Sequence, residues 1–200
     1  VLADSGEDRV GFCDSCDYAS NLEKAEIRPP VPASETPVKE NLKEVSTPGK
    51  KTVEDVTAFL KIAPERLIKT IVFESDRGLV VGLVRGDRDI NPIKLKNLIG
   101  CEWLHPAAED LIAKETKLPC GYLGPVGMKL KIYADAEVPL MSNSVTGANK
   151  PDTHLIGVQM DRDFSVEKVG DLRDVREGDP CAKCDTGTYR VKRGIEVGHI

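Results

Sequence analysis

Two pairs of cysteines, one near each end of the sequence, constrain the fold more than any other feature. Cys13 and Cys16 form one C-x-x-C pair, Cys181 and Cys184 form the other, and 164 residues lie between the pairs. Two such pairs offer four thiolates at the spacing of a tetrahedral zinc site. Disulfides or free thiols are the alternatives, but the sequence shows no signal peptide, so we favour zinc. We expect a small four-cysteine zinc knuckle formed by the two chain ends, with the intervening chain inserted at its base.

The composition allows one good hydrophobic core and narrows the class of protein. The 200 residues are 40% hydrophobic but only 4% aromatic, so the core must be largely aliphatic. A net charge of -5 argues against a protein that coats DNA or long RNA, although it allows a grip on the end of an RNA. No apolar run reaches the roughly 20 residues of a membrane span. We expect a cytoplasmic protein without DNA or membrane partners, and both ends of the sequence look cut from a longer chain.

The proline content divides the sequence into segments. Residues 1–26 carry the first cysteine pair and a short helix-like stretch over residues 19–25. Residues 27–46 are rich in proline, glutamate and lysine, which predicts an extended linker. Residues 47–164 form the predicted folded domain, and residues 165–200 return to the second cysteine pair.

The apolar spacing within the central domain predicts interleaved helices and strands. Thr52 is a cap-like residue ahead of an apolar helical stripe. This stripe consists of Val53, Val56, Phe59 and Leu60. Asn91 and Pro92 predict the start of a second helix. The other expected elements are a helix over 107–114 and strands over 68–73, 79–84, 130–134, 144–147 and 153–159. This order, without a repeat, predicts an α/β fold: a mixed sheet with surrounding helices.

The segment 121–127 is rich in glycine and is predicted to form a loop with unusual backbone conformations. Gly121, Gly124, Pro125 and Gly127 lie within seven residues. Glycine permits positive φ and close approach of another molecule, while proline fixes its own φ. Such a loop can present free amide N–H groups to an anion or a polar ligand. An ordinary surface turn is the alternative.

Lys69 and His154 are the side chains best placed for chemistry. Lys69 lies within an apolar strand, where alternation puts it on the same face as Ile71 and Phe73. An ammonium there needs a partner, unless it reaches water at a sheet edge. His154 enters a strand after a turn and could line a pocket, although a lone histidine is more often structural.

Three other polar residues are weaker candidates for a functional site. Thr47 could offer a hydroxyl, and Arg85 and Asp87 leave a strand end, where α/β proteins tend to bind ligands. A turn residue and a salt-bridged turn are the alternatives. The sequence has no convincing Ser-His-Asp order, Walker motif or H-E-x-x-H motif. Any hydrolysis would therefore depend on positioned water and backbone donors.

These residues, in their order, resemble a known family. Residues 14–26 and 193–200 resemble the segments of bacterial prolyl-tRNA synthetases that flank their editing insertion. The chain between them resembles the insertion itself, a YbaK-type aminoacyl-tRNA deacylase. The matching pieces are Thr47-Pro48, Lys51-Thr52, Ile68-Lys69-Thr70, Val84 to Asp87, Asn91, Lys94-Leu95, Gly121 to Val126, Gly147-Ala148-Asn149 and His154.

The resemblance implies an activity and a set of site residues. Members of this family hydrolyse the ester of tRNA(Pro) wrongly charged with alanine, and the 2′-hydroxyl of the terminal adenosine helps to activate water. The family's G-x-x-x-P loop falls on Gly121, Gly124 and Pro125, its functional lysine on Lys69 and its pocket histidine on His154. The implied substrate contacts are Thr47, Val53, Val56, Leu60, Arg85, Asp87 and Asn149. The partner would be the acceptor 3′ end of tRNA(Pro).

The resemblance also sets limits. The parent enzyme ligates proline to tRNA(Pro) with ATP and Mg²⁺ and is usually a homodimer, but this chain lacks the ATP site and cannot aminoacylate alone. The cysteine pairs, and thus a structural zinc, rest on spacing. The rival hypothesis is a non-catalytic, zinc-pinned insertion that binds the tRNA 3′ end or braces the parent enzyme. A free-standing deacylase with another substrate is a third possibility.

Overall fold

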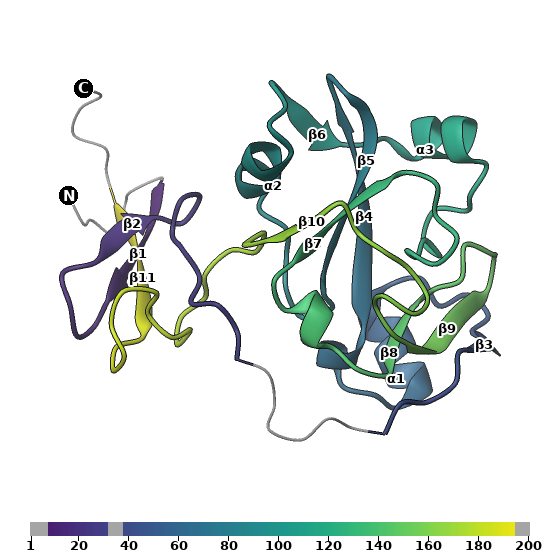
Figure 1. Ribbon diagram of the computed structural model, residues 1–200, viewed down its shortest axis with the longest axis horizontal. Coiled ribbons are helices and arrows are strands. Elements are labelled where there is room, and N and C mark those ends of the chain that lie inside the picture. The colour runs from purple at the N-terminus through teal and green to yellow at the C-terminus, as the bar shows by residue number, and fades with distance from the viewer. Residues whose placement is uncertain (1–7, 32–37, 195–200) are drawn as a thin grey trace. The chain divides into compact units, whose positions relative to one another are not determined.

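The chain folds into two compact units, which are described separately (Figure 1). The computed structural model describes residues 8–31 and 38–194. One unit joins the two ends of the chain, Val1–Pro30 and Arg173–Ile200, and the other comprises Val31–Leu172. The expected tail from Ile195 to Ile200 lies outside the described residues.

The terminal unit is built on a small antiparallel sheet. Strand β1 (Asp8–Cys13) pairs with β11 (Tyr189–Gly194) on one side and with β2 (Ala19–Asn21) on the other. The expected helix over residues 19–25 is therefore wrong. Only one helical turn forms, in which the amides of Lys24 and Ala25 donate to the carbonyl of Asn21. A stretch this short cannot sustain a helix without a broad apolar face to pack. The core of the unit contains Leu22, Ala25, Val175 and Tyr189.

The larger unit confirms the predicted α/β class with a mixed sheet. Strands β4 (Ile68–Ser75) and β5 (Gly78–Arg85) form the expected hairpin, and β6 (Leu104–Pro106) extends β4 on its other side. Strand β7 (Lys131–Asp135) runs parallel to β5, and β10 (Lys168–Gly170) runs parallel to β7. The resulting order is β10-β7-β5-β4-β6.

Alternation along these strands creates two apolar faces, which are covered on opposite sides of the sheet (Figure 1). Helix α3 (Glu109–Thr116) packs on one face through Ile112. Helix α2 (Pro92–Ile99) packs on the other through Leu95 and Ile99. Asn91 caps α2 by accepting hydrogen bonds from the next turn, as predicted.

A second, antiparallel sheet lies in the same unit. Its order is β3-β9-β8, with β3 at Lys43–Ser46, β9 at Thr153–Val158 and β8 at Ser144–Gly147. The end of the expected linker is thus a strand, because it pairs with a segment more than 100 residues away, which local composition does not reveal.

Helix α1 (Val53–Leu60) completes this region. Thr52 caps it, accepting a 3.1 Å hydrogen bond from the amide of Asp55, as expected. Val56 packs against Leu67 and Val145 in a small apolar cluster. Single 3₁₀ turns occupy Pro64–Arg66 and Val138–Leu140. Among the helices described, none has the length and apolar character needed to cross a membrane.

Candidate active site

A pocket of about 120 Å³ lies where α1, the first residues of β4, the glycine loop and the ends of β8 and β9 converge. No carboxylate is among its lining residues, whereas two lysines are. The lining consists of Lys51, Thr52, Val53, Val56, Leu67, Ile68, Lys69, Thr70, Gly121, Leu123, Gly147 and His154. The pocket thus brings together side chains from segments far apart in the sequence.

The glycine loop is docked tightly on the end of β8. Gly121 adopts φ +89°, a conformation that L side chains rarely adopt. Gly124 lies against Gly147 so closely that a Cβ at either residue would overlap the other segment's backbone. Asn149, itself at φ +57°, accepts from the Gly124 amide at 2.9 Å and donates to the carbonyls of Gly124 and Val126. Asn149 therefore fixes the shape of the loop.

Two amides of the loop already donate hydrogen bonds within the protein. The amide of Tyr122 donates to the carbonyl of Pro119, and that of Gly124 donates to Asn149. The expectation that the loop presents free N–H groups does not hold at these two positions. The loop shapes one wall of the pocket through Gly121 and Leu123.

Thr47 and His154 form a buried polar pair. Thr47 Oγ1 lies 2.6 Å from His154 Nδ1, and the two residues are 0% and 4% exposed. Burial lowers the pKa of His154 below its usual value, because the charged imidazolium is poorly solvated there. The imidazole is therefore neutral near pH 7 and can accept or donate a hydrogen bond at the pocket.

Asp152 links Tyr122 of the glycine loop to Gly49, in the segment that leads to α1. Asp152 Oδ1 accepts from the Tyr122 hydroxyl at 2.6 Å and from the amide of Gly49 at 2.7 Å. The hydrogen bond from Tyr122, followed by that from Gly49, lowers the pKa of Asp152. Neither residue was among the expected site residues. The Asn-Lys-Pro-Asp segment offered a weak signal in the sequence, because asparagine and aspartate tolerate the positive φ that Asp152 adopts, +54°.

Lys69 lies at the pocket with its ammonium group already held. Its Nζ donates to the carbonyl of Arg88 at 2.7 Å and to Asp89 Oδ1 at 2.9 Å. The predicted alternation is confirmed, since Ile71 and Phe73 pack on the same face of β4, and Ile68 and Val72 pack on the other.

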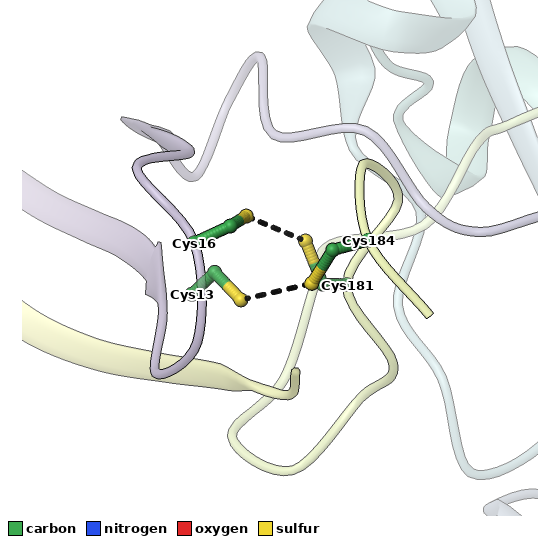
Figure 2. Close-up of side chains that lie close together, drawn as sticks. All are labelled: Cys13, Cys16, Cys181 and Cys184. Carbon is green, nitrogen blue, oxygen red and sulfur yellow. Dashed lines mark hydrogen bonds between the residues drawn. The ribbon is translucent and has the colours of Figure 1, made fainter. Parts of the chain in front are cut away.

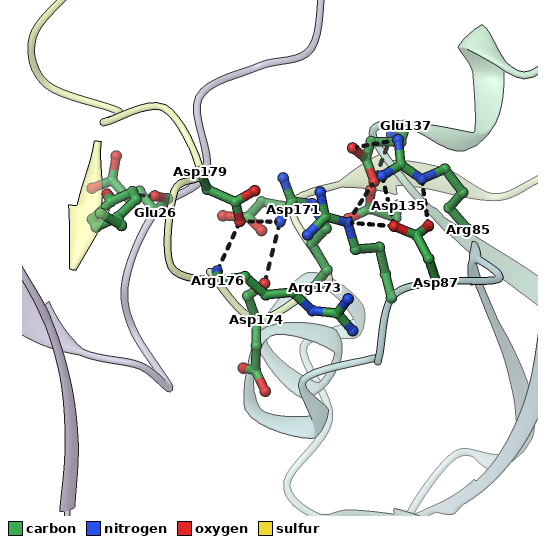
Figure 3. A network of polar contacts seen from close by, with 12 residues as sticks. Glu26, Arg85, Asp87, Asp135, Glu137, Asp171, Arg173, Asp174, Arg176 and Asp179 are labelled. Carbon is green, nitrogen blue, oxygen red and sulfur yellow. Dashed lines mark hydrogen bonds and ion pairs between the residues drawn. The ribbon is translucent and has the colours of Figure 1, made fainter. Parts of the chain in front are cut away.

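The expected substrate contacts divide into two groups. Val53 and Val56 line the pocket, and Leu60 packs in the apolar cluster behind them. Arg85 and Asp87 instead pair with each other at 2.6 Å, and Arg85 also reaches Glu137 at 3.2 Å (Figure 3). Burial, the largest single effect, raises the pKa of Asp87, but the hydrogen bond from Arg85 and the charges of Arg85 and Arg88 together outweigh it, so the pKa lies below its usual value. Both lie outside the pocket lining, so their role as substrate contacts stays a prediction.

The four knuckle cysteines converge in the terminal unit (Figure 2). Their Sγ atoms lie within 4.8 Å of one another, an arrangement that could hold a metal ion. The shorter Sγ–Sγ distances, 3.6 and 3.8 Å, are too long for disulfides.

The surroundings of the cysteines suit metal thiolates. The amides of Ser15 and Lys183 donate to Cys13 Sγ and Cys181 Sγ at 3.3 Å, which stabilises negative sulfur. Gly187 leaves no room for a Cβ beside Cys13 Sγ. The Gly187 amide lowers the pKa of Cys184 to about 7, so this thiolate is accessible at neutral pH. At Cys16, a backbone hydrogen bond from Tyr18 lowers the pKa, but burial and the neighbouring thiols outweigh it and raise the pKa to about 12, so without a cation the thiols do not all ionise together.

Comparison with known proteins identifies the family. A model described as the aminoacyl-tRNA editing domain matches residues 47–164, more than half of the chain. The chain belongs to the aminoacyl-tRNA editing domain family. This result confirms the resemblance inferred from the site motifs.

The proteins similar to this chain include enzymes that are longer than it. The chain is 50% identical over 200 residues to the proline–tRNA ligases of Geotalea daltonii and Geobacter sulfurreducens, matching 100% of the chain and 35% of each relative. It thus spans about a third of the length of these relatives. A solved structure proposed as a trans-editing enzyme for prolyl tRNA synthetase aligns with a TM-score of 0.55 and 21% identity, covering 66% of this chain and 87% of that one. This likeness supports the fold.

Proposed function

We propose that this editing domain hydrolyses alanyl-tRNA(Pro), as part of a longer proline–tRNA ligase. The observation that carries the proposal is the small pocket beside the glycine loop, within the residues that match the editing family. The 50% identity with proline–tRNA ligases supports tRNA(Pro) as the partner, bound by its acceptor 3′ end. We propose residues 47–164 as the deacylase domain and the chain ends as its connection to the ligase core.

The small size of the pocket supports selection between alanine and proline by their size. A synthetic site discriminates weakly against a smaller amino acid, because a missing methylene is worth only about 1–3 kcal/mol. A second site that admits alanine and excludes the proline ring supplies the remaining selectivity. Val53 and Val56 narrow this pocket from the side of α1, while Gly147 and Leu123 close it from the other side.

The chemistry would use water rather than a covalent nucleophile. We assign His154, fixed by Thr47, as the polar group that contacts the aminoacyl ester or the attacking water. The loop of Gly121, Gly124 and Pro125 would position the ester, and the 2′-hydroxyl of the terminal adenosine would assist in activating water. Lys69 is the functional lysine, its ammonium held in place by Arg88 and Asp89.

Hydrolysis of alanyl-tRNA(Pro) by the purified chain tests the proposal. We expect rapid release of alanine, little release of proline from prolyl-tRNA(Pro), and loss of activity in Lys69→Ala. Lys114→Ala, an exposed lysine on α3, is the matched control and should retain full activity.

A short acceptor-stem mimic at high concentration should also be hydrolysed, which separates weak tRNA binding from absent chemistry. Binding of the mimic without hydrolysis would overturn the deacylase assignment in favour of the rival hypothesis, a binding or bracing insertion.

We also propose that the four knuckle cysteines bind one structural zinc ion. Four thiolates with backbone N–H donors to sulfur match the donor set of a closed structural site. Zinc would hold together the two chain ends, with no part in hydrolysis. ATP and Mg²⁺ belong, in this proposal, to the remainder of a cytoplasmic, homodimeric ligase.

A further inference from the structure

Two lysines line the pocket, and their ammonium groups differ in what they contact. Lys69 Nζ is held by Arg88 and Asp89, as described above. Lys51 is exposed, and no hydrogen bond or ion pair engages it within the described parts of the chain. Its charge is therefore available to an incoming ligand.

The stem of Lys51 is nevertheless well positioned. It lies across the backbone of Gly121, where a Cβ would come within 3.0 Å of Lys51 Cδ and 3.1 Å of its Cγ. The Nζ atom lies 5.9 Å from the ring centroid of Tyr122. The glycine loop thus directs a cation toward the pocket.

The charge around the pocket favours an anion. The lining holds two lysines and no carboxylate, although the whole chain has a net charge of -5. Asp152 lies close enough for Lys51 to lower its pKa further, but its Oδ1 already accepts from Tyr122 and Gly49. Lys51 is therefore the lysine of the lining that has no hydrogen-bonded partner in the described parts of the chain, whereas Lys69 is paired with Asp89.

We propose that Lys51 binds the phosphate of the substrate's terminal nucleotide. The inference rests on the proposed function, since an aminoacyl-tRNA offers two kinds of charge near its ester. A lysine repels the α-ammonium of the amino acid, but it attracts the negatively charged phosphodiester on the 5′ side of the terminal adenosine. A lysine suits this contact because its compact ammonium group has three hydrogen-bond donors on a flexible stem, which can adjust to the position of the phosphate.

A pair of minimal esters isolates this contact. One is the 3′-alanyl ester of adenosine, and the other is the 3′-alanyl ester of adenosine 5′-monophosphate, which adds only the phosphate. The wild-type chain should hydrolyse the phosphorylated ester with a kcat/KM roughly tenfold higher, as expected for a hydrogen bond to a charged group. The gain should appear in KM and shrink with added salt.

Substitutions at Lys51 complete the test. Lys51→Met keeps a linear stem without the charge and should remove the preference for the phosphorylated ester over alanyl-adenosine. Lys51→Arg should retain most of the preference. Lys50→Met removes the adjacent lysine, which does not line the pocket, and should behave as wild type.

The outcomes separate this inference from the function on which it rests. Equal hydrolysis of both esters by the wild type, or a preference that survives in Lys51→Met, would overturn the role of Lys51 alone. Failure to hydrolyse either ester or alanyl-tRNA(Pro) would overturn the deacylase function, and the role of Lys51 with it.

Discussion

The backbones of Gly124 and Gly147 are in direct contact, so a Cβ at Gly124 would overlap the carbonyl of Gly147. The contact joins the glycine loop to the end of β8, and the pocket is lined by Gly121 and Leu123 of the loop and by Gly147 of β8. Neither partner can yield by changing a rotamer, because both contacting groups are backbone. The close approach, rather than a special φ, explains why glycine is needed at Gly124.

Gly124→Ala should therefore disrupt the pocket. We expect a loss of at least about 2 kcal/mol in the free energy of unfolding, because overpacking against backbone cannot relax locally, together with loss of deacylation. Urea denaturation and hydrolysis of alanyl-tRNA(Pro) measure the two effects.

Gly127→Ala is the matched control for Gly124→Ala. Gly127 has φ +75° but open space around its Cβ position, so only the conformational cost of roughly 1 kcal/mol applies. If the two substitutions had equal effects, the backbone contact would not be what holds the loop.

Asn149→Asp should loosen the same loop by another route. Aspartate tolerates the positive φ of this position and keeps the acceptor for the Gly124 amide, but it loses both donations to the carbonyls of Gly124 and Val126. We expect a destabilisation of about 1–3 kcal/mol and slower deacylation. Asn97→Asp, at an exposed position of α2, carries the same chemical change and should have little effect. Equal activities of the two variants would contradict a role for Asn149 in shaping the loop.

The sequence predicted most of the larger unit because its elements depend on local signals. Alternation in β4 and β5 and the turn at Gly78, with φ +90°, specify the hairpin without help from distant residues. Asn91 specifies the start of α2 in the same way. β3 and β10 of this unit were missed, as were β1, β2 and β11 of the terminal unit, because each is a strand only by virtue of its partner. The domain boundaries stay a prediction.

The site was predictable only in part, for a related reason. The glycine loop and His154 carry chemical signals of their own, and the structure brings both to one pocket. Asp152 could not be found in this way, since its role depends on Gly49 and Tyr122, which lie 103 and 30 positions away. Lys51 belongs to a matching piece of the sequence, but its place in the pocket was not predicted, because its stem packs on Gly121, 70 positions away.

Acidification should weaken the fold through His154. Burial holds the pKa of His154 below its usual value of 6.5, so between the two pKa values the unfolded chain binds a proton that the folded chain does not. Stability is therefore complete above pH 6.5 and is lost as the pH falls toward the folded pKa, by at most about 1.4 kcal/mol per pH unit.

Comparison of the wild type with His154→Gln isolates this effect. Urea denaturation at pH 7.5, 6.5 and 5.5 should show the gap between the two proteins narrowing as the pH falls, because glutamine does not titrate. Carboxylates titrate in both proteins and cancel in the difference. A gap that stays constant over this range would mean that His154 is not buried in its neutral form.

Removal of zinc should unfold the terminal unit and spare the pocket. The core of this unit is small, consisting of Leu22, Ala25, Val175 and Tyr189, so the metal would supply most of its stability. Cys181→Ser should lower the zinc content from one ion per chain to near zero and collapse the NMR signals of β1 and β11 into the narrow range typical of an unfolded chain. Deacylation should persist, because the pocket belongs to a unit with its own hydrophobic core.

Cys120→Ser is the control, because Cys120 lies outside the cluster of four cysteines, and this variant should keep both the zinc and the fold. Wild-type chain without bound zinc, or full zinc content in Cys181→Ser, would show that these four thiols do not form the metal site.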